Sequence, residues 1–551
     1  MNMVINSEPE TQSQPAPETR PSNAGGIAKA SAIMMVTVLA SRILGVLRDS
    51  IIAYYFGRGA ATDAYQAAFT VPDLLFYLLQ SGALSSTIVP IITEYRQLGK
   101  HRDADYTVSI VASTIFVVIG LLICVMWIKA RALTIMLNPG FDAGRIAMAV
   151  PLTRILLPAQ MFFFLGGLMM GVLYSRKEFL IPALGPVIYN SGIIFGGVAL
   201  HHWLHIEGLV WGAIGGAFVG NFLIPFIRVR QLGVHLKFSL HVLHPSARKV
   251  WAMLLPMGLG VALPNIDQIV NKLFASYLGA GETTAIMNAY RLMLLPIGIF
   301  AQALALAVYP TFAGQAAQHD YKGLRETMNA SLRNILFMTV PASVLMFLLA
   351  TPVITFLLQS GKYTASDTAA TAGALQALSV GIFAWSTQSL LTRGFYALQN
   401  SRIPVISGIC VSVIFVFMNW FVVHHTSLGV VGLGLSTSIA ATIHATALTI
   451  LLSRRLNGIH GALLLVSTIK TLIATGGLLA ATWAVQYGLT IVFPLSHIPK
   501  LSALIILLGA SAAGVAAFMG IAKMLHMPEL RDALRLLDRF KRRRTAANAS
   551  A

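Results

Sequence analysis

Charged residues are scarce in this sequence. They make up 11% of its 551 residues, whereas a soluble domain has about 25% and needs that share to cover its surface. Hydrophobic residues account for 56% of the chain, and the mean hydropathy is +0.73. This composition excludes an ordinary soluble globular protein and predicts an all-α polytopic membrane protein.

Cysteine and the common catalytic motifs are also missing or rare. The two cysteines, Cys124 and Cys410, are far apart and each falls in an apolar run, so they predict neither a disulfide framework nor a metal site. The sequence has no G-x-x-x-x-G-K-[ST] phosphate loop, no H-E-x-x-H and no G-x-S-x-G. We therefore expect a transporter without a cofactor, driven by an ion gradient, the membrane potential or the gradient of its own ligand.

Acidic residues are outnumbered by basic ones, which gives a formal net charge of +19. The basic residues lie in short clusters between apolar runs, and no aromatic and basic module accompanies them. They are therefore interpreted as determinants of membrane topology rather than of nucleic-acid binding.

Apolar runs long enough to cross a bilayer, about 20 residues each, recur along the chain. They predict fourteen spans, at 28–57, 62–95, 106–128, 146–175, 180–203, 207–229, 249–279, 282–314, 331–359, 366–399, 403–424, 428–453, 463–487 and 500–525. Several exceed the bilayer thickness, which predicts tilt or extension into water.

Basic residues are unevenly shared between the two sets of loops. The loops after even-numbered spans hold sixteen, and those after odd-numbered spans hold six. The positive-inside rule then places the even loops and both termini in the cytoplasm. Residues 1–26 are rich in Pro, Ser, Gln and Glu and have no apolar signal-peptide core, so a disordered cytoplasmic tail is expected there.

Two segments in different halves of the chain resemble each other. GVLYSRKEFLIP begins at Gly171 and GFYALQNSRIP at Gly394, with equal spacing from tyrosine to proline. Spans 1–6 and 7–12 are thus predicted to be parallel repeats, which favours two lobes rocking about a central site. The predicted organisation is a tail (1–26), an N-terminal lobe (27–229), a cytoplasmic linker (230–248), a C-terminal lobe (249–455), two extra spans (456–526) and a basic cytoplasmic tail (527–551).

The basic tail contains PELRDALRLLDRFKRRR, in which Leu530, Leu534 and Leu537 share one helical face. This pattern is typical of an amphipathic helix on an anionic leaflet. An ordinary basic segment that follows the last span explains it equally well.

The first predicted span carries charges that a bilayer normally excludes. Arg42 and Asp49 share a helix face, and Arg48 is adjacent to Asp49. Ionisable residues at this depth usually face a bundle interior or a watery cavity, although those near a helix end can extend to the interface instead. Asp63 opens the second span, where it either belongs to the functional site or caps its own helix.

Further charged residues lie in spans 4, 7 and 8. Span 7 contributes Asp267 and Lys272, span 8 contributes Arg291, and Arg154 in span 4 is another candidate. Guanidinium groups suit phosphate oxygens, so a cavity with surplus cations predicts an anionic ligand such as a phosphate or pyrophosphate head group. Alternatively, each arginine pairs separately with a carboxylate or a helix C-terminus, and the arginines form no common ligand site.

Three histidines, His201, His202 and His205, form an H-H-x-x-H cluster in a short loop. Without a cysteine or acidic partner set they indicate an interfacial loop rather than a metal site. We predict no bound metal.

Several motifs occur together in a specific order. SRILGVLRD (41–49), FGRGAATDAY (56–65), GALSSTIVPIITEY (82–95), AYRLMLLPIG (289–298) and LLQSGKYTASD (357–367) closely resemble the MurJ (MviN) lipid II flippase family. LNPGF (137–141), LFASYLG (273–279) and GFYALQNSRIPV (394–405) agree with it. The resemblance covers spans 1–12, and the last two spans match mainly in hydrophobicity.

The resemblance implies a fourteen-helix fold of the multidrug/oligosaccharidyl-lipid/polysaccharide exporter superfamily. It also implies movement of lipid II across the bacterial cytoplasmic (inner) membrane. By this resemblance Arg42, Arg48 and Arg291 would bind the pyrophosphate, and Asp49 and Asp63 would serve gating or charge balance. We add Asp267 to the gating or charge-balance residues from its position in span 7. Spans 13 and 14 would hold the polyprenyl tail. We expect a monomer in contact with membrane lipids, with cell-wall synthesis proteins as further partners.

One part of the family pattern is not reproduced. Phe76, Tyr77 and Ser81 stand where the family usually has charged residues, and Asp73 replaces an asparagine. Removing a cation together with an acidic partner can preserve charge balance, so lipid II transport remains the leading hypothesis. The alternatives are export of another lipid-linked saccharide or a drug, or a non-transporting scaffold of cell-wall assembly.

Overall fold

The computed structural model describes residues 24–79, 81–241, 244–245, 248–252, 266–495 and 498–532. Within these ranges, the side chains of residues 24–33, 35, 77–79, 81–83, 85 and 86 are not described. The predicted tail 1–26 therefore lies almost wholly outside the described residues, as do parts of the linker 230–248 and of the seventh predicted span.

The described residues form helices and no strands, which confirms the all-α fold class. The first half contains α1 (Ala24–Phe56), α2 (Ala60–Ala68), α3 (Thr70–Leu79), α4 (Ser81–Gln97), α5 (His101–Ile128), α6 (Ala130–Leu137), α7 (Ala143–Leu156), α8 (Ala159–Ser175), α9 (Leu180–Ala199), α10 (His201–Leu204), α11 (Glu207–Gly216), the π-helix η1 (Ala217–Leu223) and α12 (Ile224–Gln231). The second half contains α14 (Ile266–Ala275), α15 (Glu282–Pro296), the π-helix η3 (Ile297–Gln302), α16 (Ala303–Ala317), α17 (Tyr321–Leu348), α18 (Ala350–Leu357), α19 (Ala365–Ser379), α20 (Ile382–Ala397), α21 (Arg402–His425), α22 (Gly429–Arg455), α23 (Gly461–Val492) and α24 (Pro499–Met524).

The predicted count of fourteen spans is not confirmed. Among the described residues, ten helices are long and apolar enough to cross a membrane, or eleven if α19 and α20, bent by 45°, form one span. The second predicted span is divided into α2, α3 and α4. Pro72 falls in the first turn of α3, where its missing N–H costs no helical hydrogen bond, and proline disfavours helical backbone at the residue before it.

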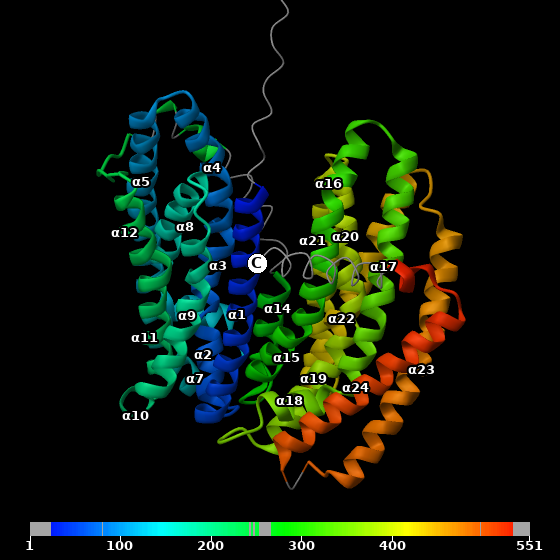
Figure 1. Ribbon diagram of the computed structural model, residues 1–551. Helices are drawn as coiled ribbons and strands as arrows, with labels where there is room; N and C mark the ends of the chain where they lie inside the picture. The colour runs from blue at the N-terminus through cyan, green and yellow to red at the C-terminus, as the bar shows by residue number, and fades with distance from the viewer. Residues whose placement is uncertain are drawn as a thin grey trace, which may run out of the picture.

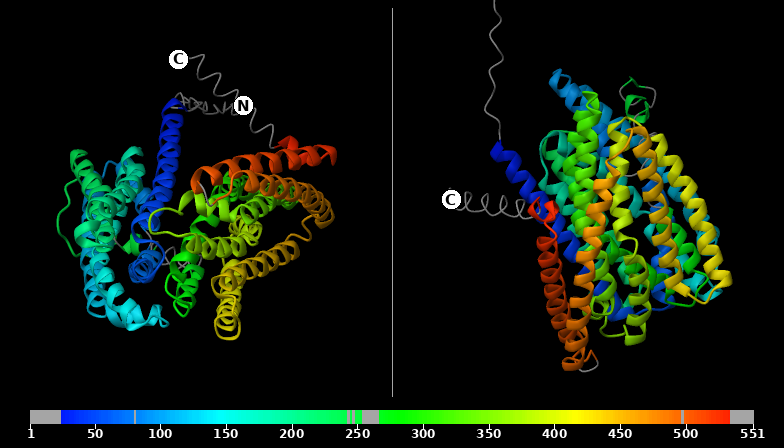
Figure 2. Two further views of the ribbon diagram at one scale, coloured as in Figure 1. Left: turned by 90° about the horizontal axis from the view of Figure 1, so that it is seen from below. Right: turned by 90° about the vertical axis from the view of Figure 1, so that its right-hand side faces the viewer.

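The helices gather into two bundles with separate cores (Figure 1). The buried apolar clusters of the first bundle draw mainly on α1 to α12, while the main cluster of the second draws almost entirely on α14 to α22. The bundles are in contact at the lower end of Figure 1 and apart at the upper end. In both views of Figure 2, α23 and α24 lie on the outside of the second bundle, against α17 and α18. Two separate cores allow the bundles to move as units.

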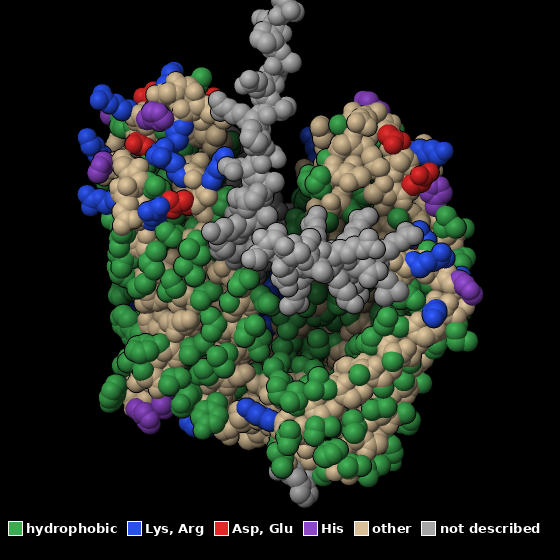
Figure 3. Space-filling model, in the orientation of Figure 1, with side chains coloured by type: hydrophobic (Ala, Val, Ile, Leu, Met, Phe, Trp, Pro, Cys, Tyr) green, Lys and Arg blue, Asp and Glu red, His purple; other side chains and the backbone are tan. Residues whose placement is uncertain are grey.

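The surface is that of a multi-pass membrane protein. Large apolar side chains are exposed on α5, α21 and α23, among them Leu121, Phe417 and Trp483. In Figure 3 apolar side chains cover the middle and lower parts of both bundles, and most charged side chains on this face gather at the upper end. Exposed apolar area on this scale indicates contact with lipid.

The two turns of the predicted repeat have the same backbone conformation. Lys177 has φ +59°, and Gln399, its equivalent in the second segment, has φ +54°. The amide of each donates to the carbonyl of the repeat tyrosine before it, Tyr174 and Tyr396, at 2.9 Å. Helices α8 and α9 are thus joined as α20 and α21 are, which supports the duplication.

The first of these turns carries a pH-dependent ion pair. Arg228 donates from Nε and Nη2 to the two carboxylate oxygens of Glu178 at 2.8 and 2.5 Å, and this hydrogen bonding lowers the pKa of Glu178. A lowered carboxyl pKa contributes stability above the ordinary value of 4.5, and this is lost as the pH falls through the folded-state value.

We expect Glu178→Gln to lower the free energy of unfolding at pH 7 by no more than about 1 kcal/mol, because the pair is partly exposed. The difference from wild type should shrink as the pH falls below 4.5 and vanish below the folded-state pKa of Glu178, which thermal unfolding in detergent at a series of pH values can measure. Glu326→Gln, at an exposed position on α17, is the control. A difference that persists unchanged at low pH would contradict the assignment.

The first residues of the basic tail pack against the protein. Met527 and Leu530 are buried in a cluster with Phe337 and Phe518. Glu529 is 3% exposed; it accepts a hydrogen bond from Ser467 at 2.8 Å and pairs with Arg333 at 3.1 Å. Leu534 and Leu537, on which the amphipathic interpretation also depends, lie outside the described residues.

Candidate functional site

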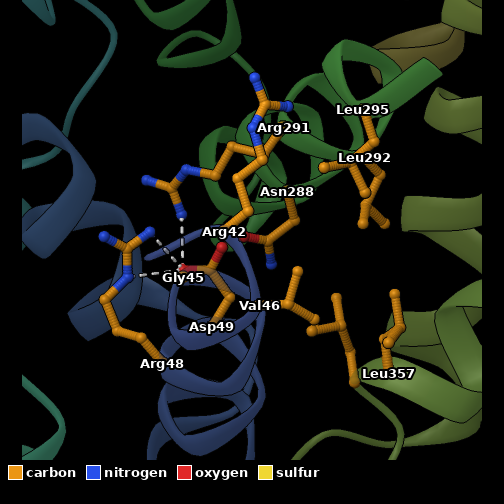
Figure 4. A pocket seen from close by; sticks show the side chains of 11 residues that line it. Arg42, Gly45, Val46, Arg48, Asp49, Asn288, Arg291, Leu292, Leu295 and Leu357 are labelled. Atoms are coloured by element: carbon orange, nitrogen blue, oxygen red, sulfur yellow. Dashed lines mark hydrogen bonds and ion pairs between the residues drawn. The ribbon is translucent and has the colours of Figure 1, made fainter. Parts of the chain in front are cut away.

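A cavity of about 170 Å³ lies between α1 of the first bundle and α15 and α18 of the second. Arg42, Arg48 and Asp49 line it from α1, and Asn288 and Arg291 from α15 (Figure 4). Its remaining lining is largely apolar, including Leu292, Leu295 and Leu357. Residues from opposite halves of the sequence thus form one site with three guanidinium groups and a single carboxylate.

Asp49 is the centre of the charged cluster. Its Oδ1 accepts from Arg48 Nε at 3.0 Å and Nη2 at 2.8 Å, and from Arg291 Nη1 at 3.1 Å (Figure 4). Two neutral amides complete the arrangement, because Arg48 also donates to Asn190 Oδ1 at 3.0 Å and Arg291 to Gln66 Oε1 at 2.9 Å. One carboxylate shared by two guanidinium groups leaves a surplus positive charge.

Arg42 adds a further positive charge. No carboxylate among the described residues lies within ion-pair distance of its guanidinium, which approaches the backbone of η3 where Gly298 has no side chain. With Arg48, Asp49 and Arg291, the four ionisable side chains that line the cavity carry a net charge of about +2 at neutral pH. The chemistry of this cavity therefore suits a multivalent anion.

Gly298 is expected to position Arg42. A Cβ at residue 298 would lie 2.7 Å from Arg42 Nη1, so Gly298→Ala should displace the guanidinium by a few tenths of an ångström or more. Because the displaced group is the end of a flexible side chain, we expect the melting temperature to change by only about 2 °C while ligand affinity falls by about threefold. Thermal unfolding and ligand titration test this. Gly314→Ala, with open space around residue 314, is the control, and an unchanged affinity would contradict the prediction.

Asp63 connects the two bundles at their closed end. It is completely buried, and its carboxylate accepts from the Gly281 amide at 2.6 Å, the Thr284 amide at 2.8 Å and the Thr284 hydroxyl at 2.7 Å. Gly281 is the N-cap residue of α15 and has φ +91°, a conformation that favours glycine. Asp63 of α2 thus supplies the capping carboxylate that Gly281 lacks. It caps a helix of the other bundle rather than its own.

Other contacts reinforce this closed end. Arg58, between α1 and α2, pairs with Glu282 at 3.1 Å and Asp367 at 3.0 Å in the second bundle. Backbone and hydroxyl contacts across the same boundary join Lys362 N to Tyr54 O, Ser50 Oγ to Leu357 O, and Gly140 N to Ser276 Oγ, at 2.9, 2.6 and 3.0 Å. We call Asp63, Arg58 and their partners in the second bundle the latch.

Two candidates lie away from the cavity lining. Arg154 stacks over the Trp127 ring at 4.8 Å and donates to the Trp127 carbonyl at 3.3 Å. The grouping of Arg154 with the cavity arginines is therefore corrected: it extends toward α5, where the Trp127 ring and a carbonyl in the last turn of the helix interact with its guanidinium. Asp267 accepts from the Tyr290 hydroxyl at 3.0 Å within the second bundle.

Lys272 is 7% exposed and does not line the cavity. Its Nζ lies 3.8 Å from Asp73 Oδ2 and 3.4 Å from Thr70 Oγ1, both on α3. Lys272 therefore pairs across the two bundles.

The atypical residue Phe76 belongs to an aromatic cluster. Its ring centroid lies 5.9 Å from that of Phe163, which lies 5.4 Å from that of Tyr189. The side chains of Tyr77 and Ser81 are outside the described residues. The His201 ring, in the histidine cluster, is tilted against the rings of Tyr55 and His202, with centroid distances of 4.2 and 3.9 Å. The described residues contain no group of three or more His, Cys, Asp or Glu placed to hold a metal ion.

Sequence reasoning missed Gln66, Asn190 and Thr284. Gln66 and Asn190 are neutral amides in apolar helices, 3% and 8% exposed. A lone amide in an apolar run is a detectable signal, because its burial requires a hydrogen-bond partner. Thr284 gave no such signal, because its hydroxyl and amide act as donors to Asp63 only in the folded protein, where the two residues are adjacent.

A model of the family described as "Lipid II flippase MurJ" matches residues 52–503, which is most of the chain. The chain belongs to this family. It is therefore a transporter rather than an enzyme.

Individual relatives agree with this assignment. The chain is 29% identical to the lipid II flippase MurJ of Burkholderia cenocepacia over 428 residues, covering 76% of this chain and 82% of the relative. It is 26% identical to the probable lipid II flippase MurJ of Vibrio cholerae, with the same coverage of both chains.

Solved structures share the fold. A lipid II flippase MurJ in an inward closed conformation superimposes with a TM-score of 0.73 at 23% identity, covering 91% of this chain and 100% of that one. An inward-facing multidrug transporter of the MATE family superimposes with a TM-score of 0.64 at 15% identity, covering 77% and 98%. At these identities the likeness concerns the fold alone.

Proposed function

We propose that this protein is a lipid II flippase, which moves undecaprenyl-pyrophosphate-linked peptidoglycan precursor across the bacterial cytoplasmic membrane. The observation that carries the proposal is that Arg42, Arg48 and Arg291 line one cavity with a single carboxylate, Asp49, between two bundles of a MurJ-family chain. A pyrophosphate carries several negative charges, and guanidinium groups bind phosphate oxygens through paired N–H donors.

Within the proposal, the pyrophosphate replaces Asp49 as the main partner of the arginines. Arg48 and Arg291 already point at one acceptor, Asp49 Oδ1, and Asn190 and Gln66 each accept from one further nitrogen, Arg48 Nη1 and Arg291 Nη2. Their orientation is thus fixed before the ligand arrives, which reduces the entropy lost on binding. The apolar exterior of α23 and α24 would accommodate the polyprenyl chain.

We propose that transport proceeds by alternating access, with the latch closing the outer end. The end at which the bundles separate carries most of the basic loops, and the positive-inside rule assigns that end to the cytoplasm. The arrangement would then be the inward-facing state, with both termini in the cytoplasm of a bacterium and Asp63 releasing α15 when the outer end opens.

The proposal includes an energy source and an assembly state. Because the sequence lacks a phosphate loop, an ion gradient or the membrane potential would drive the cycle. We propose that a monomer carries out transport and that partners in cell-wall synthesis supply or consume the precursor.

Complementation of a bacterial strain depleted of its own lipid II flippase tests the proposal. Wild type should restore growth, and Arg42→Ala, Arg48→Ala and Arg291→Ala should not. Arg154→Ala is the matched control, since Arg154 contacts Trp127 rather than the cavity. Failure of wild type despite normal membrane levels would contradict the flippase assignment, and three silent cavity substitutions would contradict the cationic site.

The position of Phe76 favours a second candidate function, in which the substrate is a lipid-linked saccharide other than lipid II. The ring of Phe76 packs against Phe163 where the family usually has a cation, so contacts to the head group beyond the pyrophosphate differ from the family pattern. Export of another lipid-linked saccharide would be supported if purified protein bound an undecaprenyl-pyrophosphate glycan without peptide as tightly as lipid II.

A further inference from the structure

Asp73 and Lys272 form an ion pair between the bundles that the described cavity does not use. Asp73 lies on α3 and Lys272 on α14, and Lys272 Nζ is 3.8 Å from Asp73 Oδ2. The lysine side chain is 8% exposed, whereas that of Asp73 is 31% exposed. The carboxylate is thus accessible from one side while the ammonium group is enclosed.

The geometry of this pair is that of a weak contact. The separation of 3.8 Å between Lys272 Nζ and Asp73 Oδ2 is too long for a hydrogen bond, and the lysine donates otherwise to Thr70 Oγ1 at 3.4 Å. The latch pairs of Arg58, by comparison, are 3.0 and 3.1 Å long. Burying an ammonium group is costly unless its partners are close and well aligned. Asp73 is therefore a weak partner for Lys272, and a more highly charged anion at the same place would bind the lysine more strongly.

Lys272 lies on a helix adjacent to one that lines the cavity, because α14 packs against α15, which carries Arg291. Helix α3 has no basic residue of its own, and one turn beyond Asp73 it presents Phe76 to Phe163. Lys272 is thus the cation that the second bundle supplies beside α3.

We propose that Lys272 is a further phosphate-binding cation of the transport site and that Asp73 holds it until the anionic head group takes the place of the carboxylate. The inference rests on the proposed function, because it assumes a lipid-linked pyrophosphate as ligand. An ammonium group binds phosphate as a point charge with three donors. Since Asp73 and Lys272 belong to different bundles, the exchange also removes a contact that joins them.

The test is the affinity of full-length purified protein for undecaprenyl pyrophosphate in detergent. Lys272→Gln should weaken binding by about tenfold, the value of one charge-assisted contact. Asp73→Asn should strengthen binding by about threefold or more, because the competing carboxylate is gone. In the Lys272→Gln background, Asp73→Asn should have no effect, and Lys272→Arg should retain most of the affinity.

The exposed pair of Glu94 and Lys249, 2.7 Å apart, provides matched controls. Glu94→Gln and Lys249→Gln should leave the affinity unchanged. A purely structural contact between the bundles predicts that Asp73→Asn and Lys272→Gln both weaken binding, and this result would overturn the inference even if Lys272→Gln folded poorly.

The proposed function and the inference fail in different ways. If wild type does not bind undecaprenyl pyrophosphate, the proposed function is wrong and the inference falls with it. If wild type binds and neither Asp73→Asn nor Lys272→Gln changes the affinity, only the inference is overturned.

Discussion

Replacing Arg291 with alanine is expected to reduce growth of a complemented flippase-depleted strain by at least about 100-fold. Arg291 donates to Asp49 at 3.1 Å and to Gln66 at 2.9 Å, and it contributes one of three cavity guanidinium groups. Each charge-assisted hydrogen bond is worth about 1.5–3 kcal/mol, so the loss of two toward a phosphate corresponds to roughly two orders of magnitude or more. Plating efficiency under depletion measures the effect.

Two comparisons make this result specific. Arg291→Lys keeps the charge but not the planar fork, so it should be intermediate. Arg154→Ala removes a guanidinium from the same membrane region, where it contacts Trp127, and should grow like wild type. Equal loss of growth in both alanine variants at matched membrane levels would mean that the defect is structural.

Replacing Asp63 with asparagine is expected to open the closed end of the protein, where the two bundles are in contact. The carboxylate accepts three hydrogen bonds from Gly281 and Thr284, and Arg145 Nη1 lies 3.8 Å away. An asparagine amide group would place a donor against a donor and leave Arg145 with less neutralising charge. Breaking a buried charged network of this kind costs about 3–5 kcal/mol, which is enough to convert a minor conformation into a major one.

Spin labels at His202 of the first bundle and His425 of the second can measure this change. Both positions are exposed, and His202 lies in α10 while His425 ends α21. Wild type should give one short distance distribution, and Asp63→Asn should add a longer one. Asp142→Asn alters an exposed carboxylate that pairs with the same Arg145 at 2.5 Å and should not shift the distribution. An unshifted distribution in Asp63→Asn would mean that the latch does not set the conformational equilibrium.

The sequence was sufficient for the fold class and for the identity of the charged residues. A charge in an apolar run is conspicuous whatever surrounds it, so Arg42, Arg48, Asp49, Asp63 and Arg291 could be selected from one chain. The repeat was also visible, because the tyrosine and the proline on either side of the left-handed turn at Lys177 and Gln399 keep the same spacing in both segments.

Pairing between distant elements could not be predicted. Asp63 was a candidate for gating or for capping its own helix, and only the approach of α15 makes it the cap of a second-bundle helix. Arg154, like Arg48, is an arginine in an apolar run, yet the position of Trp127 determines where the Arg154 side chain points. The partners of these side chains lie on other helices, far away in sequence, so no local pattern encodes them. The division of the second predicted span has a related cause, since breaks such as that before α3 depend on packing.

Transbilayer movement of fluorescent lipid II in proteoliposomes tests the central claim most directly. Vesicles that contain wild-type protein should expose labelled lipid in the opposite leaflet faster than empty vesicles. Vesicles with the Arg48→Ala/Arg291→Ala variant should match the empty ones, and those with Arg154→Ala should match wild type. Movement by wild type no faster than in empty vesicles, or equal movement by the double variant, would contradict transport of lipid II through the arginine cavity.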